Sequence, residues 1–369
     1  MKIDRIALSG FRNYDEETAE FSPGVNILRG ENAQGKTNLL EAVYLLTGAH
    51  SFRTRFDREL IGFGCDWASI LADVDSDGRE QTVRLLFRRG QRRTVTVNGA
   101  KKTSAELAGV VRAVLFSPDD LYLIKEGAAA RRRLMDAAIP QLRRRYAQLL
   151  TDYNRLYENK TRILRDWREK PRLLDTLDEF SDGLARCSAS ILRYRASFVD
   201  RLGELSAPIH RDFSGGSESL SLAYRTVSTV TDPHAPAEEI YYQICEHQER
   251  HRQAELDAGQ CLTGIHKDDI DILINGVPAR TFASQGQTRT AALSMKLAER
   301  EIFKNETGEY PVLLLDDVLS ELDAGRQEFV LNRIGGGQTF ISCCEDGTIR
   351  RRTGGRVFAV RAGSIRREE

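Results

Sequence analysis

The chain combines two hydrophobic patterns, short apolar runs and longer segments in which apolar residues recur every three or four positions. Residues 24–28 and 311–315 are apolar runs flanked by turn-forming or polar residues, and they predict buried strands. Residues 38–46 and 289–302 have the composition and spacing of helices. Residues 356–360 read as one more strand near the C-terminus. Together these segments predict an α/β fold.

The middle of the chain has a different pattern. Apolar residues recur at helical spacing over residues 141–169 and again over 177–202, and Pro171 separates the two runs. This predicts two long helices in an antiparallel hairpin. A further helix is expected over residues 236–257, whereas 210–234 is rich in Ser, Thr, Gly and Asp and predicts a loop or weak strands.

Composition narrows the class of protein. The 369 residues favour two domains or one large interrupted domain. The net charge is zero although 29% of residues are charged, so any nucleic-acid surface must be a local patch. The six cysteines lack CxxC spacing, which favours reduced thiols over a metal site or disulfide framework. With no apolar run of signal-peptide or membrane-span length, we expect a cytoplasmic protein with no membrane partner.

Residues 30–37 fit the P-loop pattern GxxxxGK[ST] and lie between a predicted strand and a predicted helix. Gly30 and Gly35 allow the loop to curl so that its backbone N–H groups face a phosphate. Lys36 is expected to reach the β- and γ-phosphates, and the Thr37 hydroxyl to bind Mg²⁺. ATP and Mg²⁺ are therefore the predicted ligands.

The apolar run at 311–315 ends in two acids, Asp316 and Asp317. A buried parallel strand would deliver both to the sheet edge where the P-loop lies. We expect Asp316 to hold Mg²⁺, directly or through water, and Asp317 to orient or activate the attacking water. With Lys36, these acids are the predicted catalytic residues.

The two halves of this site are far apart in the sequence, because Asp316 stands 279 residues after Thr37. One compact nucleotide-binding unit then requires an insertion between them. We therefore expect a discontinuous head, residues 1–110 plus 262–369, interrupted by a helical lobe over residues 111–261.

Two short segments beside the acidic strand resemble motifs of ABC-type ATPases. One resembles the signature motif (L)SGGQ with a glutamine in place of its first glycine, and consists of Ser284, Gln285, Gly286 and Gln287. The other, running from Ser320 to Asp323, resembles the D-loop. Both occur in the order expected for an ABC-type ATPase head, a mixed β-region plus a parallel sheet with helices.

The resemblance implies that the signature acts in trans. In ABC-type ATPases it lies at a helix N-terminus and meets the γ-phosphate held by a second subunit. The Ser284 hydroxyl and the N–H groups of Gln285 and Gly286 are suitable anion donors, and a helix dipole would assist them. ATP would then join two copies of this chain in a homodimer, and hydrolysis would release them.

A split head with a short helical insertion resembles the RecF family, within the SMC and DNA-repair branch of ABC-type ATPases. The matching stretches are residues 8–14, 30–38, 116–121, 283–287 and 315–323. The resemblance implies a slow, DNA-stimulated ATPase that dimerises on ATP and binds duplex DNA near single-strand gaps. It also implies that the protein helps to load RecA with RecO and RecR, in gap repair and the SOS response.

The same resemblance implies roles for individual residues. Arg12 and Asn13 would approach the nucleotide from the N-terminal β-region, although the same pair is equally typical of a hairpin turn. The phosphate loop would consist of Gly30, Asn32, Gly35, Lys36, Thr37 and Asn38.

The chain also departs from the ABC pattern. Asp317 stands where transporters have Glu, which suits slow turnover. The segment after residue 338 lacks the switch-loop His of transporters, and Ser342 is the nearest hydroxyl. Residues 264–269 have no assigned role and are expected to form a turn at a strand edge.

Four arginines mark a candidate DNA surface. Arg88, Arg89, Arg92 and Arg93 flank a glycine in an expected β-hairpin and are suited to neutralising phosphates. Such residues also form solvated or ion-paired faces. No base-stacking aromatic motif accompanies them, so we expect binding through phosphate and shape with little sequence preference.

Other functions remain open at this stage. An SMC-like chromosome-organising ATPase would need long coiled coils. A transport or translation ABC subunit would have its nucleotide motifs much closer together. For a small-molecule P-loop kinase, the signature and D-loop would be coincidences.

Overall fold

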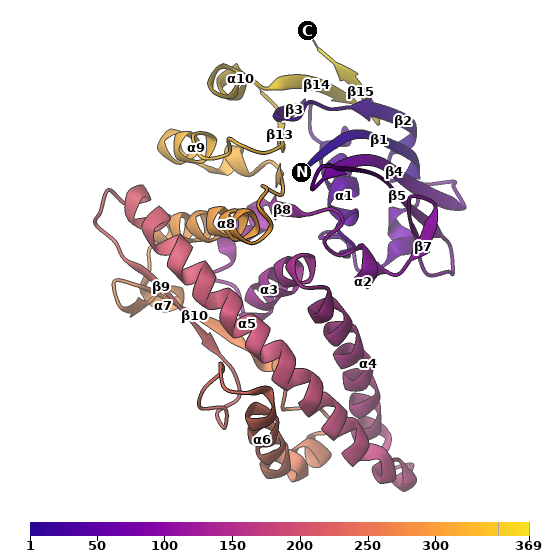
Figure 1. Cartoon of the computed structure of the whole chain (residues 1–369), viewed down its shortest axis with the longest axis vertical. Coiled ribbons are helices and arrows are strands. Elements are labelled where there is room, and N and C mark those ends of the chain that lie inside the picture. The colour runs from indigo at the N-terminus through magenta and orange to yellow at the C-terminus, as the bar shows by residue number, and fades with distance from the viewer. Residues whose placement is uncertain (346, 369) are drawn as a thin grey trace. The chain divides into compact units, whose positions relative to one another are not determined.

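The computed structural model describes residues 1–345 and 347–368, and the chain divides into two compact units (Figure 1). The head consists of Met1–Tyr122 and Arg289–Glu369, and the helical unit consists of Leu123–Thr288. The head is therefore discontinuous, but both expected boundaries, at 110/111 and 261/262, are wrong. In the structure both boundaries lie further along the chain.

Strand pairing explains these shifts. β8 (Ala113–Phe116) pairs with β12 (Val312–Leu315), which keeps it in the head. β10 (Asp269–Ile274) pairs with β9 (Leu220–Arg225), which keeps it and the residues up to Thr288 in the helical unit. The signature segment Ser284–Gln287 accordingly belongs to the helical unit and not to the head.

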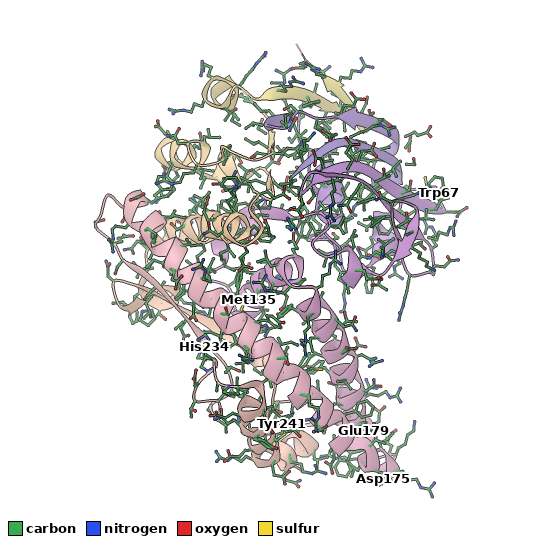
Figure 2. The ribbon with its side chains drawn as sticks, in the orientation of Figure 1. Trp67, Met135, Asp175, Glu179, His234 and Tyr241 are labelled. Atoms are coloured by element: carbon green, nitrogen blue, oxygen red, sulfur yellow. The ribbon has the colours of Figure 1, made fainter. Side chains whose placement is uncertain are left out.

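The first sheet of the head is antiparallel, in the order β2-β1-β4-β5-β6-β7 (Figure 1). Its strands are β1 (Lys2–Phe11), β2 (Tyr14–Glu20), β4 (Trp67–Ser76), β5 (Arg79–Arg88), β6 (Thr94–Val97) and β7 (Ala100–Lys102). From Arg5 to Gly10, alternate residues of β1 are buried, as expected for a sheet with one face on a core. Trp67, at the start of β4, is 46% exposed (Figure 2).

The second sheet has the order β15-β14-β3-β13-β12-β8, and all neighbours except β15 and β14 are parallel. Besides β8 and β12 it contains β3 (Val25–Arg29), β13 (Thr339–Cys343), β14 (Arg356–Arg361) and β15 (Ser364–Arg367). β12 and β13 are buried along their whole length, which explains the continuous apolar sequence of β12. The strands predicted near 24–28, 311–315 and 356–360 are confirmed.

Helices complete the head. They are α1 (Lys36–Leu45), α2 (Ser104–Leu107), most of α8 (Gln285–Thr307), α9 (Ala324–Leu331) and α10 (Gly347–Thr353), with the short 3₁₀ segments η1 (Asp57–Leu60), η2 (Pro118–Tyr122) and η5 (Val318–Glu321). Leu39 and Leu40 of α1 have no exposed surface and belong to one core with residues of both sheets.

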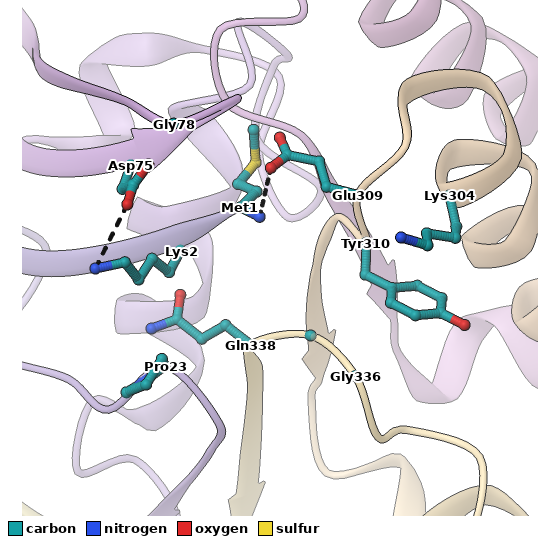
Figure 3. Close-up of a pocket in the computed structure, with 11 residues that line it drawn as sticks. Met1, Lys2, Pro23, Asp75, Gly78, Lys304, Glu309, Tyr310, Gly336 and Gln338 are labelled. Carbon is teal, nitrogen blue, oxygen red and sulfur yellow. Dashed lines mark hydrogen bonds and ion pairs between the residues drawn. The ribbon is translucent and has the colours of Figure 1, made fainter.

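Gln338 joins the two sheets at the amino-terminal edge of the parallel one. Its side chain accepts from Ile3 N–H at 2.7 Å and donates to Ile3 O and Ser22 O at 2.8 Å each. A cavity of about 370 Å³ opens here, where Met1 N donates to Glu309 at 2.8 Å (Figure 3). The Gln338 amide therefore fixes the start of β13, in one sheet, against β1 in the other.

The helical unit contains α3 (Ala128–Leu142), α4 (Arg144–Asp166), η3 (Pro171–Thr176), α5 (Leu177–Phe213), α6 (Ala237–Ala258), η4 (Ile265–Lys267), α7 (Ala279–Phe282) and the sheet β11-β10-β9, with β11 at Val277–Pro278. α4 and α5 pack together as the expected hairpin (Figure 1). Asp175 and Glu179 lie at its turn (Figure 2). The first helix begins at Arg144 rather than 141, because Arg143 is extended.

A buried polar network gives residues 264–269 a role that the sequence did not reveal. Arg195 of α5 is 2% exposed and donates to Ile265 O at 2.7 Å and to Asp268 at 2.8 Å. The same guanidinium donates to Asp136 of α3 at 2.9 Å.

Among the described residues, no helix combines the length and apolar character needed to cross a membrane.

Candidate functional site

The P-loop connects the carboxyl end of β3 to the start of α1. Gly35 has a φ of +120°, a conformation that favours glycine. A Cβ on Gly30 would come within 2.3 Å of Val360 O, so this position also excludes any side chain. The two glycines of the motif are thus required by the shape of the loop itself.

Lys36 is 3% exposed and lies across the loop. Its ammonium donates to Gly30 O at 2.6 Å and to Glu31 O at 3.2 Å. The Cys344 sulfur lies 3.6 Å from Lys36 Nζ and 3.4 Å from Asn32 Oδ1, which brings the predicted Asn32 to the same loop. The arrangement concentrates one positive charge where a phosphate chain would lie.

Thr37 and Asp316 meet across the sheet edge. Thr37 Oγ1 donates to Asp316 Oδ1 at 2.8 Å, although 279 residues separate them. Asp316 is 6% exposed; burial raises its pKa, while hydrogen bonds from Thr37 and Ser342 oppose the rise. Adjacent ligands of octahedral Mg²⁺ at 2.1 Å lie about 3.0 Å apart, so these two oxygens fit a magnesium site.

Ser342, at the end of β13, joins the two acids. Its hydroxyl donates to Asp316 Oδ1 at 3.0 Å and accepts from Asp317 N–H at 2.8 Å. Asp317 has a φ of +50°, unusual for a residue with a side chain and typical of functional turns. The serine noted only as the nearest hydroxyl therefore contacts both acidic residues.

Arg12 and Asn13 form the β1–β2 turn and also contact the P-loop region, so the two readings of this pair are compatible. Asn13 donates to Gln34 O at 3.0 Å and accepts from Asn38 at 2.7 Å. Arg12 forms a two-pronged pair with Glu41 of α1 at 2.7 and 2.8 Å. These contacts fix the turn against the first turns of α1.

Sequence reasoning missed Glu41 and Arg53. Glu41 has no exposed surface. It is the one acidic residue between residues 32 and 56, and this isolated charge in an apolar helix was a weak sequence signal for a buried partner. Arg53 donates to Asn38 at 2.5 Å and lies 3.8 Å from Glu41. Its position in an irregular segment gave no sequence signal.

The signature segment begins α8. Ser284 and Gln285 are exposed, and Ser284 N–H donates to Gln287 Oε1 at 2.9 Å. Gln287 N–H donates in return to Ser284 Oγ at 3.2 Å, a reciprocal cap of the helix. Ser284 Oγ only accepts in this cap, so the hydroxyl keeps its own hydrogen for donation to an anion.

The D-loop residues lie in the head. Ser320 Oγ donates to Asp317 O at 2.5 Å, and Asp323 caps α9 by accepting from Arg326 N–H at 2.9 Å. That bond is the main cause of the lowered pKa of Asp323. The structure thus brings the D-loop to the acidic pair.

The predicted DNA surface needs one correction. The β5–β6 hairpin is confirmed, and Arg88, Arg89 and Arg92 are exposed on it. The Arg93 side chain is only 7% exposed, pairs with Asp57 at 3.3 Å and donates to Ala49 O at 2.8 Å. Burial lowers its pKa. Arg93 therefore has a structural role, and we leave it out of the proposed DNA surface.

The cavity of Figure 3 is not the candidate site. Its residues Pro23 and Gln338 precede β3 and β13, at the amino-terminal edge of the parallel sheet. Lys36 and Asp316 follow β3 and β12, at the carboxyl edge. Ligands of open α/β sheets bind at the carboxyl edge.

Comparisons with known proteins show which family this chain matches. Residues 2–362 match the model of the RecF/RecN/SMC N terminal domain. A DNA replication and repair protein RecF from Acetivibrio thermocellus is 41% identical over 346 residues, 94% of each chain. Another from Lactobacillus johnsonii is 40% identical over 345 residues, 93% of this chain and 92% of that protein.

Solved structures give the same result. This chain is similar to a solved structure of the recombination mediator protein RecF-ATPrS in the RecFOR pathway, with a TM-score of 0.92 and 33% identity. The match covers 100% of this chain and 98% of that chain. RecF-ATP matches with a TM-score of 0.87 and 33% identity, over 100% and 97%. An Smc head domain from Pyrococcus furiosus, with a TM-score of 0.56 at 16% identity over 99% and 95%, shares the fold.

Proposed function

This chain belongs to the RecF family of the RecF/RecN/SMC ATPases, and we propose that it is an ATP-dependent recombination mediator acting on DNA in the cytoplasm. The family is one of DNA replication and repair proteins. The observation that carries the proposal is the 2.8 Å contact between Thr37 and Asp316, which joins the two halves of an ATPase site.

The head residues have distinct roles in ATP hydrolysis. Lys36 and the backbone N–H groups of the P-loop bind the β- and γ-phosphates. Thr37 and Asp316 would hold Mg²⁺, which would supply positive charge to the phosphate oxygens. Asp317 orients the attacking water and accepts its proton. Its short side chain and its fixed backbone are consistent with slow turnover.

We propose that ATP also joins two chains. Ser284 is exposed at the start of a 23-residue helix, and its hydroxyl hydrogen can be donated to a partner's γ-phosphate. Ser320, which donates to Asp317 O, and Asp323, which caps α9, would contact the same composite site.

DNA binding is assigned to the β5–β6 hairpin. Arg88, Arg89 and Arg92 are exposed and would neutralise backbone phosphates of duplex DNA near a single-strand gap. The proposal includes cooperation with RecO and RecR in loading RecA, in gap repair and the SOS response; the similarity to recombination mediators of the RecFOR pathway supports it. Stimulation of ATP hydrolysis by DNA belongs to the same proposal.

Two substitutions test the ATP switch. Lys36→Ala should abolish tight ATP binding, whereas Ser284→Ala should bind ATP but fail to dimerise. Light scattering with a slowly hydrolysed ATP analogue measures the dimer. Ser284→Ala dimers as stable as those of the parent would contradict the proposal.

A second measurement separates this function from a P-loop kinase. The ATPase rate per chain should rise with protein concentration, with and without DNA, because the site is shared. A rate independent of concentration, together with phosphate transfer to a small acceptor, would favour the kinase.

A further inference from the structure

The signature segment is attached to a carboxylate outside the motif. Gln287 Nε2 donates to Glu218 Oε1 at 2.8 Å, within the helical unit. The other carboxylate oxygen of Glu218 pairs with His210 Nε2 at 3.0 Å. His210 lies in the last turn of α5 and has no exposed surface. Glu218 thus bridges the end of a 37-residue helix and the signature segment.

The carboxylate determines how the Gln287 amide is oriented. An ionised Glu only accepts hydrogen bonds, so it must face the NH₂ group of Gln287. The amide oxygen then faces Ser284, where it accepts from Ser284 N–H at 2.9 Å. If the Gln287 amide were reversed, its NH₂ group would face the Ser284 N–H, donor against donor. Its oxygen would face the Glu218 carboxylate, acceptor against acceptor. The position of Ser284 therefore depends on the acceptor that Glu218 presents to the Gln287 amide.

Glu218 is itself held by its surroundings. Its N–H donates to Ser214 Oγ at 3.2 Å, after a turn in which Gly215 and Gly216 have positive φ. Burial lowers the pKa of His210, which favours a neutral ring whose Nε2–H donates to Glu218. Among the described residues, His210 Nδ1 has no hydrogen-bond partner, which suits the unprotonated nitrogen of that tautomer.

The residue before Ser284 is anchored from another direction. Lys125 Nζ donates to Ala283 O at 2.8 Å and to Arg280 O at 3.2 Å. Ser284 is exposed, while Ala283 before it and Gln287 after it are each held by a hydrogen bond. This arrangement restrains a donor that must meet an anion brought by another molecule.

We propose that Glu218, supported by His210, is a positioning residue for the signature motif and sets the strength of ATP-dependent dimerisation. The inference rests on the proposed function, in which Ser284 binds the partner's nucleotide. Glu218 acts through Gln287 and Ser284 and does not itself touch ATP.

Three variants test the proposal. Glu218→Ala removes the bridge. Glu218→Gln can keep the bond to Gln287, because its amide oxygen accepts from the Gln287 NH₂. It gives up the support from His210, since a ring that accepts from the new NH₂ would bury an Nδ1–H that has no partner among the described residues. Glu204→Ala is the control, since Glu204 lies on α5, its side chain is 61% exposed and it pairs with Arg201 at 2.8 Å.

Light scattering and equilibrium binding with the slowly hydrolysed analogue give the first readout. Glu218→Ala should bind ATP like the parent but dimerise about tenfold more weakly, the effect of losing one hydrogen bond to a charged group. Glu218→Gln should recover most of the dimer, and Glu204→Ala should match the parent. Parent-like dimerisation by Glu218→Ala would overturn the proposal.

Amide hydrogen exchange of the nucleotide-free protein gives a readout that does not depend on dimerisation. The Gln287 N–H, bonded to Ser284 Oγ, should exchange about tenfold faster in Glu218→Ala and near the parent rate in Glu218→Gln. Unchanged exchange in Glu218→Ala would also overturn the proposal. If the parent failed to dimerise on ATP, the proposed function would fail, and hydrogen exchange would still decide whether Glu218 positions the segment.

Discussion

Asp316→Asn should make the head more stable and unable to bind Mg·ATP productively. The Asp316 carboxylate is 6% exposed, and burial raises its pKa. An Asn oxygen can still accept from the Thr37 and Ser342 hydroxyls. The substitution therefore removes an unfavourable buried charge while it keeps both hydrogen bonds.

The gain in the free energy of unfolding should be about 1 kcal/mol, typical of relieving one strained functional site. For a unit the size of the head, Met1–Tyr122 with Arg289–Glu369, that corresponds to a rise in Tm of about 2–4 °C. Thermal unfolding without nucleotide measures it. Asp15→Asn, an exposed position on β2, is the matched control and should shift Tm very little.

The sign of the pH dependence follows from the raised pKa. The folded state binds this proton more tightly than the unfolded chain, so the penalty is full above the folded pKa. It disappears as pH falls from the folded pKa towards the ordinary value of 3.8. The advantage of Asp316→Asn over the parent should therefore shrink on acidification.

Nucleotide reverses the order of stability. A ligand at a hundred times its Kd raises the free energy of unfolding by about 2.7 kcal/mol. The parent should gain this much from Mg²⁺ and a slowly hydrolysed ATP analogue. Asp316→Asn should gain much less and should lose ATPase activity. An Asn variant that melts below the parent without nucleotide, or keeps the full nucleotide-dependent shift, would refute this reasoning.

Three further predictions concern separate parts of the chain. Arg89→Gln should weaken DNA binding and reduce its salt dependence without changing Tm. Arg93→Gln should instead lower the free energy of unfolding by about 1–3 kcal/mol, because it leaves buried partners unsatisfied. If the two variants changed DNA binding and Tm equally, the assignment of Arg89 to DNA and Arg93 to the fold would be contradicted. In the parent, Lys160 pairs at 2.7 Å with Glu255, which is 2% exposed. Lys160→Met leaves this buried carboxylate without its cation and should lower the free energy of unfolding of the helical unit by about 3–5 kcal/mol, measured with urea. An unchanged urea midpoint would contradict this. Asp323→Ala should lose the cap of α9 and lower the free energy of unfolding by about 1 kcal/mol in thermal unfolding. Asp323→Asn should retain most of that stability, because Asn can also cap a helix. Equal losses in the two variants would show that the cap contributes nothing.

The local parts of the fold and site could be predicted from the sequence. The strand, loop and helix around Lys36 follow from an apolar run, two glycines and a helical pattern, all within about 25 neighbouring residues. The strand before Asp316 was equally predictable, because a short run without polar residues suits a strand buried on both faces.

The remaining features depend on pairings between distant segments. The head extends past residue 110 because β8 pairs with β12, and no local pattern identifies that partner. Arg93 resembles Arg92 in sequence, yet only the fold places Asp57 against it. The bond between Gln287 and Glu218 depends in the same way on how the helical unit folds.

The measurement that tests the central claim most directly mixes two inactive variants. Lys36→Ala keeps its signature segment and Ser284→Ala keeps its P-loop, so a mixed dimer contains one complete composite site. We predict that ATPase activity appears only in the mixture, at up to about a quarter of the parent rate for random pairing of two-fold dimers. No activity beyond that of the separate variants, under conditions where mixed dimers form, would contradict a nucleotide site shared between two chains.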